Sequence, residues 1–171
     1  MKKYQLAIVG ATGLVGQEFI RLLEQRNFPI SSIQLFASDR SAGKKLNFAG
    51  EAVEVRETTA DSFRGIDIAL FSAGAEISHY FSPIAARSGA VVVDNSSAFR
   101  MVPSVPLVVP EVNPEDIKWH SGIIANPNCS TIQMVTVLYP LHKLNPIKRI
   151  VVDTYQAVSG TGSAAVEELT V

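Results

Sequence analysis

The sequence has one cysteine and almost no net charge, and each scarcity excludes a class of protein. A single cysteine among 171 residues cannot form an internal disulfide, which excludes a secreted disulfide scaffold. Fifteen basic and sixteen acidic residues give a formal charge of −1. The chain therefore lacks the broad basic footprint of a protein that binds nucleic acid or an anionic membrane.

Long hydrophobic runs are also missing. The N-terminal segment begins with two lysines and a short apolar run, but Gly10, Thr12 and Gly13 interrupt it. No stretch approaches the roughly 18 apolar residues of a membrane-spanning helix. No group of His, Cys, Asp and Glu has the spacing of metal ligands. We therefore expect a cytoplasmic protein with no nucleic-acid, membrane or metal partner.

What the sequence does contain is an alternation of short β-branched runs with longer helical patterns. Apolar residues recur on one helical face over 14–25, and helical patterns also cover 77–88 and the residues from the cysteine through Leu141. This alternation predicts an α/β fold, a doubly wound Rossmann-type parallel sheet. Candidate strands cover 5–9, 33–37, 52–55, 68–72, 91–94, 107–109, 123–125 and 147–155.

A cluster of four prolines between Pro103 and Pro114 marks the one break in this organisation. We expect a dinucleotide-binding domain over 1–127 and the beginning of a second, α+β catalytic and dimerisation domain over 128–171. Residues 163–171 are typical of a helix that begins and has no stop signal, so we expect the chain to be cut off inside this second domain.

The run Gly10-Ala11-Thr12-Gly13-Leu14-Val15-Gly16 lies between the first predicted strand and the first predicted helix. Glycines there permit a tight turn and a close approach of the backbone to a pyrophosphate, while the helix N-terminus supplies free N–H donors. This context predicts a dinucleotide site. The alternative is a glycine-rich turn without a ligand.

The end of the second predicted strand bears on which dinucleotide binds. The hydroxyls of Ser38 and Ser41 and the guanidinium of Arg40 suit the 2′-phosphate of NADP. Asp39 instead favours NAD, because an acidic residue at this place can hold the ribose hydroxyls of that cofactor. We favour NADP.

Cys129 follows a turn and stands at the start of a predicted helix. The helix dipole there favours a thiolate, and nearby N–H groups could hold an oxyanion. The alternative is a buried structural cysteine. A thiolate beside a nicotinamide suggests acyl transfer followed by reduction, which also needs an acid/base group. His79, His120 and His142 do not pair with the cysteine, and we interpret each as a surface or capping residue.

Three motifs together resemble the aspartate-β-semialdehyde dehydrogenase family: residues 10–16, Asn126-Pro127-Asn128-Cys129-Ser130-Thr131, and Tyr155-Gln156-Ala157-Val158-Ser159-Gly160. Residues 91–100 and 109–113 are similar to the family as well, so the resemblance runs along the whole chain. It implies the NADPH-dependent reductive dephosphorylation of L-aspartyl-4-phosphate to aspartate semialdehyde, in lysine, threonine and methionine biosynthesis.

The resemblance also implies roles for individual residues. Cys129 would be the acyl-accepting nucleophile, Arg100 would bind the substrate's phosphate with Asn128 nearby, and Gln156 would orient the substrate. The remaining positions would lie at the NADP site: Gly10, Thr12, Gly13, Leu14, Val15, Ser38, Arg40, Ser41, Ser72, Ala73, Gly74, Ser159 and Gly160. Of these, Ser159 and Gly160 would lie near the nicotinamide.

The chain also departs from the family pattern. In the family a catalytic histidine comes from a second half, beyond residue 171, and the full-length protein is expected to be a homodimer or homotetramer. We therefore expect this chain alone to bind nucleotide weakly and to turn over little or nothing. Two rival interpretations are N-acetyl-γ-glutamyl-phosphate reductase, a sister enzyme, and a non-catalytic NADP-sensing module that would have no use for a thiol at a helix start.

Overall fold

Strand β1 (Tyr4–Val9) shows how the sequence builds the core. Successive side chains of a strand alternate between the faces of the sheet. Accordingly, Leu6 and Ile8 pack in one buried cluster with Ile20 of helix α1 (Leu14–Gln25), whereas Ala7 and Val9 belong to a second cluster. That second cluster includes Ala85 of helix α2 (Ala75–Arg87). A strand that is apolar on both faces thus lies at the centre of a sheet covered on both sides.

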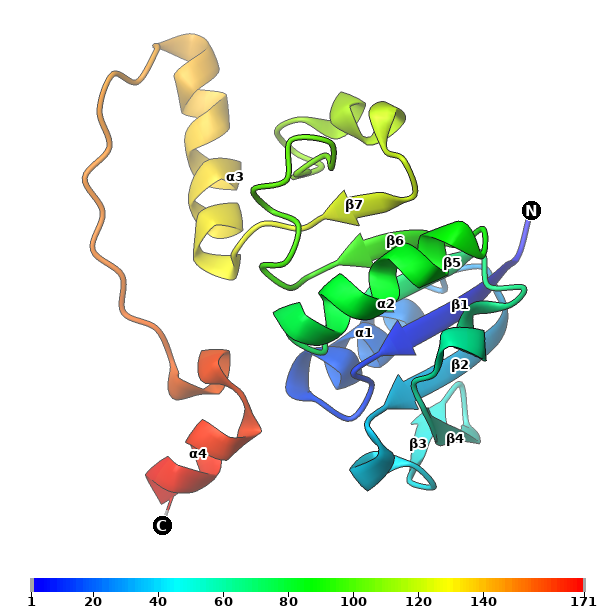
Figure 1. Cartoon of the computed structure of the whole chain (residues 1–171). Helices are drawn as coiled ribbons and strands as arrows, with labels where there is room; N and C mark the ends of the chain where they lie inside the picture. Colours follow the sequence, from blue (N-terminus) through cyan, green and yellow to red (C-terminus); the bar gives the residue numbers. More distant parts are fainter. Residues whose placement is uncertain (1, 171) are drawn as a thin grey trace.

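The computed structural model describes residues 2–170, and its sheet has seven strands in the order β3-β4-β2-β1-β5-β6-β7 (Figure 1). All neighbouring strands pair in parallel except β3 and β4, which form an antiparallel hairpin. The strands after β1 are β2 (Ile30–Ala37), β3 (Lys45–Phe48), β4 (Glu51–Glu57), β5 (Ile68–Phe71), β6 (Val91–Asp94) and β7 (Ile123–Ala125).

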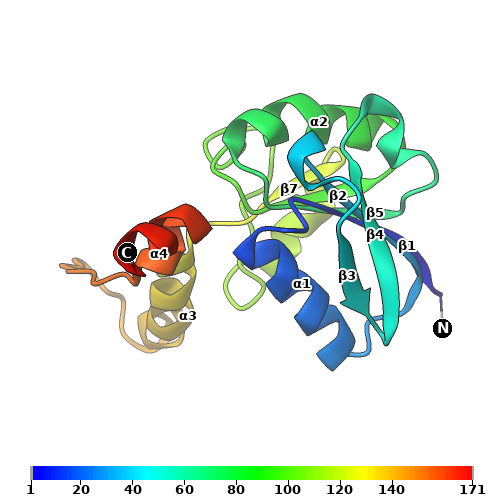
Figure 2. The same cartoon turned by 90° about the horizontal axis from the view of Figure 1, so that it is seen from below.

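The two halves of the sheet are wound in opposite directions from β1. Helix α1 leads to β2 on one side, while β5, α2 and β6 build the other side. Figure 2 shows α1 and α2 on opposite faces of the sheet. This arrangement confirms the doubly wound α/β fold. The strand order reverses between β1 and β5, and in such sheets ligands bind at the carboxyl ends of the strands near that point.

Two of the predicted strands do not form. Residues 107–109 make only an isolated bridge, Leu107 to Ala125. Residues 147–155 are irregular and exposed, with Val151 at 77% and Tyr155 at 100% exposure. Their β-branched composition predicted a strand, but a strand also needs a neighbour for its backbone hydrogen bonds, and within residues 2–170 this segment has none.

One strand was not predicted. β3 is a short edge strand with polar residues at alternate positions, and it pairs with β4 through the turn at Ala49 and Gly50, both of which have positive φ. Such a turn reverses the chain within a few residues.

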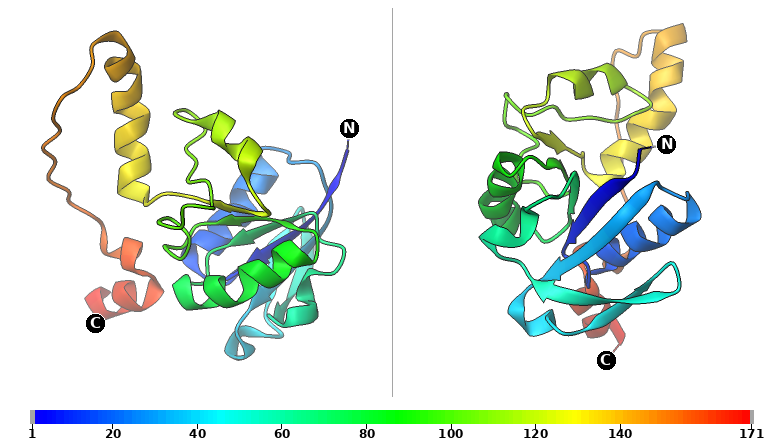
Figure 3. Two further views of the ribbon diagram at one scale, coloured as in Figure 1. Left: turned by 45° about the horizontal axis from the view of Figure 1, so that its top comes forward. Right: turned by 90° about the vertical axis from the view of Figure 1, so that its right-hand side faces the viewer.

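The C-terminal part of the chain comprises helix α3 (Cys129–Leu144), the 3₁₀ turn η4 (Val158–Thr161) and helix α4 (Ser163–Thr170). In Figures 1 and 3 residues 145–157 leave the far end of α3 as extended chain and return to η4. Within the described residues, no helix has the length and apolar character needed to cross a membrane. The predicted domain boundary after residue 127 stays a prediction.

Candidate active site

The glycine loop after β1 is tight because three backbone segments meet there. Gly10 has a φ of +87°, and a Cβ atom on it would overlap the backbone carbonyl of Ser72 at the end of β5. A Cβ on Gly16 would likewise overlap the carbonyl of Gly10. Gly13 is the N-cap of α1 and makes no side-chain cap, so the first-turn N–H groups of that helix remain available to a phosphate.

A cavity of about 460 Å³ opens beside this loop, and it is called the nucleotide cavity below. It brings together residues from three distant parts of the chain that were predicted to bind the cofactor: Gly13, Leu14, Val15, Ser72, Gly74, Ser159 and Gly160. Two other cofactor candidates do not line the cavity. Gly10, the first residue of the loop, lies against the backbone of Ser72, and Ala73 packs against the buried core. The cavity has the position expected of a dinucleotide site at the switch point of a doubly wound sheet.

Sequence reasoning missed part of the lining of this cavity. Asn95, Ser96 and Ser97 follow β6, and Thr161, Gly162 and Ser163 connect η4 with α4. The first group could have been found from strand order, since β6 pairs with β5 and their carboxyl ends therefore share an edge. The second group carries no comparable signal, because it follows the irregular segment.

At the end of β2, the turn η1 (Asp39–Ser41) approaches the glycine loop. Ser38 is its N-cap, and the hydroxyl of Thr12 donates to that of Ser41 at 3.4 Å. The carboxylate of Asp39 accepts the N–H of Arg40 at 2.7 Å, while Arg40 itself is exposed. Asp39 is thus engaged in shaping its own turn.

Cys129 is exposed and is the first residue of α3. The thiol is thus not buried among the residues that the structure describes, and its role as nucleophile stays a prediction. The side chain of Asn128 caps the helix, because its Oδ1 accepts the N–H of Ser130 at 3.0 Å. The thiol therefore lies at an ordered helix N-terminus, where backbone N–H groups and the helix dipole favour negative charge.

Arg100 is held by two backbone carbonyls from different strand ends. Its Nε donates to the carbonyl of Asn126 and its Nη2 to that of Asn95, both at 2.9 Å. The amide of Asn126 also donates to Oδ1 of Asn95 at 2.6 Å. Asn95 lines the nucleotide cavity and Asn126 lies three residues before Cys129. These bonds connect the cavity, the guanidinium and the thiol-bearing helix.

Gln156 lies directly against Gly160. A Cβ atom on Gly160 would occupy the position of the Gln156 amide. Because Gly160 has no side chain, the amide of Gln156 can pack against η4, beside the cavity that Gly160 lines.

Each of the three histidines has a contact away from the thiol. The ring of His79 packs against Phe99 with centroids 5.2 Å apart. Nδ1 of His120 accepts the N–H of Gly122, and Nδ1 of His142 accepts that of Ile147, both at 3.0 Å. His79 and His142 are exposed and His120 is the C-cap of the 3₁₀ turn η3 (Pro114–Trp119), which agrees with the interpretation of each as a surface or capping residue.

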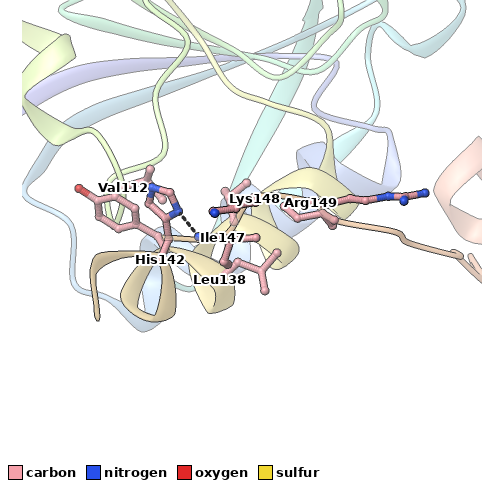
Figure 4. A pocket seen from close by; sticks show the side chains of 9 residues that line it. Val112, Leu138, His142, Ile147, Lys148 and Arg149 are labelled. Carbon is pink, nitrogen blue, oxygen red and sulfur yellow. Dashed lines mark hydrogen bonds between the residues drawn. The ribbon is translucent and has the colours of Figure 1, made fainter. Parts of the chain in front are cut away.

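A second cavity, of about 350 Å³, lies between α3 and the chain that follows it. Figure 4 shows His142 bonded to Ile147 at this cavity, with Val112 and Leu138 beside them and Lys148 and Arg149 on the following segment. None of the predicted site residues lines it, so it is separate from the nucleotide cavity.

The fold and the cavity define a Rossmann-type dinucleotide-binding protein with a cysteine at a helix start. Residues 5–120 match the family model "Semialdehyde dehydrogenase, NAD binding domain", and residues 138–171 match "Semialdehyde dehydrogenase, dimerisation domain". The chain belongs to the semialdehyde dehydrogenase family.

The relatives within this family are named aspartate-semialdehyde dehydrogenases, which agrees with the resemblance seen in the motifs. The chain is 59% identical to the enzyme of Aquifex aeolicus over 169 residues, which are 97% of this chain and 50% of that protein. The crystal structure of aspartate semialdehyde dehydrogenase II from Vibrio cholerae complexed with ASA superposes with a TM-score of 0.97 at 48% identity, over 99% of this chain and 51% of that one.

A more distant solved structure, aspartate semialdehyde dehydrogenase with NADP from Candida albicans, has a TM-score of 0.72 at 31% identity, over 85% of this chain and 48% of that one. The chain thus spans about half the length of the curated relatives it matches.

Proposed function

We propose that this chain forms the NADP-binding and nucleophile-bearing part of an aspartate-semialdehyde dehydrogenase. The observation that carries the proposal is the exposed Cys129 at the capped start of α3, tied through Asn126 and Asn95 to the nucleotide cavity. The names of the relatives, several more than 50% identical to this chain, support aspartyl phosphate rather than a longer acyl phosphate as the substrate.

The proposed chemistry begins at the sulfur of Cys129. The thiolate attacks the acyl carbon of L-aspartyl-4-phosphate, the bond from that carbon to the phosphate oxygen breaks, and inorganic phosphate leaves while the acyl group stays on Sγ as a thioester. First-turn N–H groups of α3 would stabilise the oxyanion that develops during the attack. Arg100 would bind the phosphate, because its fork of donors suits that anion.

NADP is the cofactor that we propose for this cavity and for the neighbouring turn η1. The glycine loop would receive the pyrophosphate, and Thr12, Ser38, Arg40 and Ser41 would surround the 2′-phosphate. The guanidinium of Arg40 and the hydroxyls of Ser38 and Ser41 support NADP over NAD, because these donors suit a 2′-phosphate. When bound, NADPH supplies the hydride that reduces the thioester to the semialdehyde. Gln156, packed on Gly160, would orient the substrate between thiol and cavity.

A proton-transferring group is also needed, and we propose that it is none of the three histidines, because none of them lines the nucleotide cavity and each contacts a group away from Cys129. The chain alone should therefore turn over little or nothing. A rate with aspartyl phosphate within the ordinary enzymatic range of about 1–1000 per second would contradict this proposal. The match to a dimerisation domain supports a homodimer or homotetramer for the whole protein, which sedimentation of a full-length relative can test.

The cofactor assignment is tested by thermal unfolding of the chain with NADP and NAD. A ligand that binds only the folded state stabilises it by about 2.7 kcal/mol at a hundred times its dissociation constant. We expect NADP to raise the melting temperature at lower concentration than NAD does. In Arg40→Ala, loss of a charge-assisted bond should weaken NADP about 10–100-fold and leave NAD within about twofold. A preference for NAD that depends on Asp39 would overturn the assignment.

The thiol assignment is tested by alkylation of Cys129 with iodoacetamide. We expect rapid labelling that aspartyl phosphate slows, since the acyl phosphate would occupy the same site. An inert thiol, unaffected by the acyl phosphate, would favour the NADP-sensing module. Stronger protection by N-acetyl-γ-glutamyl phosphate than by aspartyl phosphate would favour the sister enzyme.

A further inference from the structure

Asp94 is a buried carboxylate directly before the Asn95–Ser97 part of the cavity lining. It is the last residue of β6, pairs with Phe71 on β5 and Ala125 on β7, and is 0% exposed. The salt bridges found within residues 2–170 do not include it. A buried carboxylate destabilises a fold by several kcal/mol unless hydrogen bonds offset the loss of water.

Three donors surround this carboxylate. Oδ1 accepts the hydroxyl of Ser78 at 2.8 Å and the N–H of Ser96 at 3.0 Å, and Oδ2 accepts the hydroxyl of Ser96 at 2.8 Å. Ser78 belongs to α2, whereas Ser96 belongs to the loop that lines the nucleotide cavity. Asp94 therefore fastens that loop to a helix of the core.

The same loop ends at Arg100. The hydroxyl of Ser96 also accepts the N–H of Ala98 at 3.1 Å, and Ala98 and Phe99 pack with Ala125 in a small buried cluster. The turn between Asp94 and Arg100 is thus held at its beginning and at its middle. These contacts determine the position of the Arg100 backbone, from which its side chain extends.

The two carbonyls that hold Arg100 both adjoin Asp94, one through the chain and the other through a backbone hydrogen bond that does not involve the carboxylate. One is that of Asn95, the neighbour of Asp94. The other is that of Asn126, whose own N–H donates to the backbone carbonyl of Asp94 at 2.8 Å. These two bonds use two of the five N–H donors of the guanidinium, so its remaining donors have a set direction.

We propose that Asp94, with Ser78 as its partner, is a positioning residue that orients Arg100 toward the phosphate of the substrate. The inference rests on the proposed role of Arg100 in binding that phosphate. Asp94 itself does not line the cavity, so it acts through Arg100 and through the Asn95–Ser97 loop.

The test compares two serines of the same helix in the 171-residue chain. Ser78 and Ser82 are both fully buried on α2, but the hydroxyl of Ser82 has no hydrogen-bond partner within the described residues. Ser78→Ala removes a bond to Asp94, whereas Ser82→Ala removes the same atom without removing a bond. Asp94→Asn serves as a second variant that keeps the shape of the side chain.

The first readout is hydrogen exchange of the Arg100 Nε–H by NMR, with the signal assigned by its absence in Arg100→Lys. We expect exchange about tenfold faster in Ser78→Ala and Asp94→Asn, as loss of a bond to a charged group predicts, and unchanged exchange in Ser82→Ala. Equal exchange in Ser78→Ala and Ser82→Ala would overturn the inference.

The second readout is protection of Cys129 from iodoacetamide by inorganic phosphate. We expect the phosphate concentration for half-protection to rise about tenfold in Ser78→Ala, in proportion to the loss of the same bond. Phosphate that protects every variant equally would overturn the positioning role and leave the proposed function intact. Phosphate that fails to protect even the natural sequence would instead overturn the role of Arg100 in the proposed function, and the NMR comparison would still decide whether Asp94 orients the side chain.

Discussion

Two apolar segments of this chain, β1 and residues 150–152, have similar composition but differ in burial: the first is buried in the sheet and the second is exposed. Leu6, Ile8 and Val9 in β1 are at most 1% exposed, whereas Ile150, Val151 and Val152 are 50–77% exposed. The difference is that β1 lies between β2 and β5, while the later segment has no neighbouring strand within residues 2–170. β-branched residues thus favour a strand, but the strand forms only where a neighbouring strand pairs with it.

Helix α3 extends the contrast. None of its residues, all of which the structure describes, is buried, although Val137, Leu141 and Leu144 are apolar. Helix α1, whose apolar residues share one face, buries Ile20 and Gly16 against the sheet. The region around the sheet therefore supplies its own core, and residues 129–170 do not.

The largest expected effect follows from breaking the core of the sheet region. The ring of Phe63 is fully buried and packs near the rings of Phe36, Phe71 and Phe81. Phe63→Ala should lower the free energy of unfolding by about 3–5 kcal/mol, because it leaves a cavity among these rings. Urea unfolding would measure it.

The matched change in the other region is Val137→Ala, on α3, where the side chain is 66% exposed. It should change the free energy of unfolding by less than about 0.5 kcal/mol, as surface substitutions do. A comparable loss in both variants would show that α3 is packed as tightly as the sheet, and the contrast drawn above would be wrong.

A smaller effect is expected at the cap of α3. Asn128→Ala removes the acceptor of the Ser130 N–H and should destabilise the first turn of the helix by about 1 kcal/mol. Amide hydrogen exchange across α3 would report this loss. The control is Asn145→Ala at the opposite end, where the structure shows no side-chain cap, and equal effects at both ends would show that the amide of Asn128 is not the cap.

The smallest effect is expected on the exposed face of α1. The hydrogen bond that Arg21 donates to Glu18 lowers the pKa of that carboxyl. A lowered pKa in the folded state means that the pair's contribution is present above the unfolded pKa and is lost as pH falls through the folded pKa. Both side chains are about half exposed, so Glu18→Gln should leave the melting temperature unchanged at pH 7. A clear shift would show that this surface pair stabilises the fold.

The parts of the fold that the sequence predicted well are those with strong local patterns. Helix α1 and strand β6 have the predicted bounds, because an amphipathic stripe and a run of three valines each identify an element without reference to the rest of the chain. Strand β3 was missed since its polar alternate residues look like a loop, and 147–155 was mistaken for a strand because pairing is not a local property.

The candidate site was predictable to the same degree. Gly10, Gly13 and Gly16 follow from the geometry of a strand–turn–helix unit, and Cys129 from its place before a helical pattern. The anchoring role of Asp94 was not predictable, and Asn95–Ser97 could be found only by way of the strand order, because asparagine and serine are ordinary turn residues. Their importance arises only once β5, β6 and β7 lie side by side.

The exposed run Ile150–Val152 has one more consequence, which concerns solubility. A β-branched segment with unpaired backbone groups is a template for strand addition between copies of a chain, and so for aggregation. Lys148, Arg149 and Asp153 flank the run with charges, in the manner of gatekeeper residues that oppose such pairing. We therefore expect this chain to aggregate more readily as salt screens those charges or as its concentration rises.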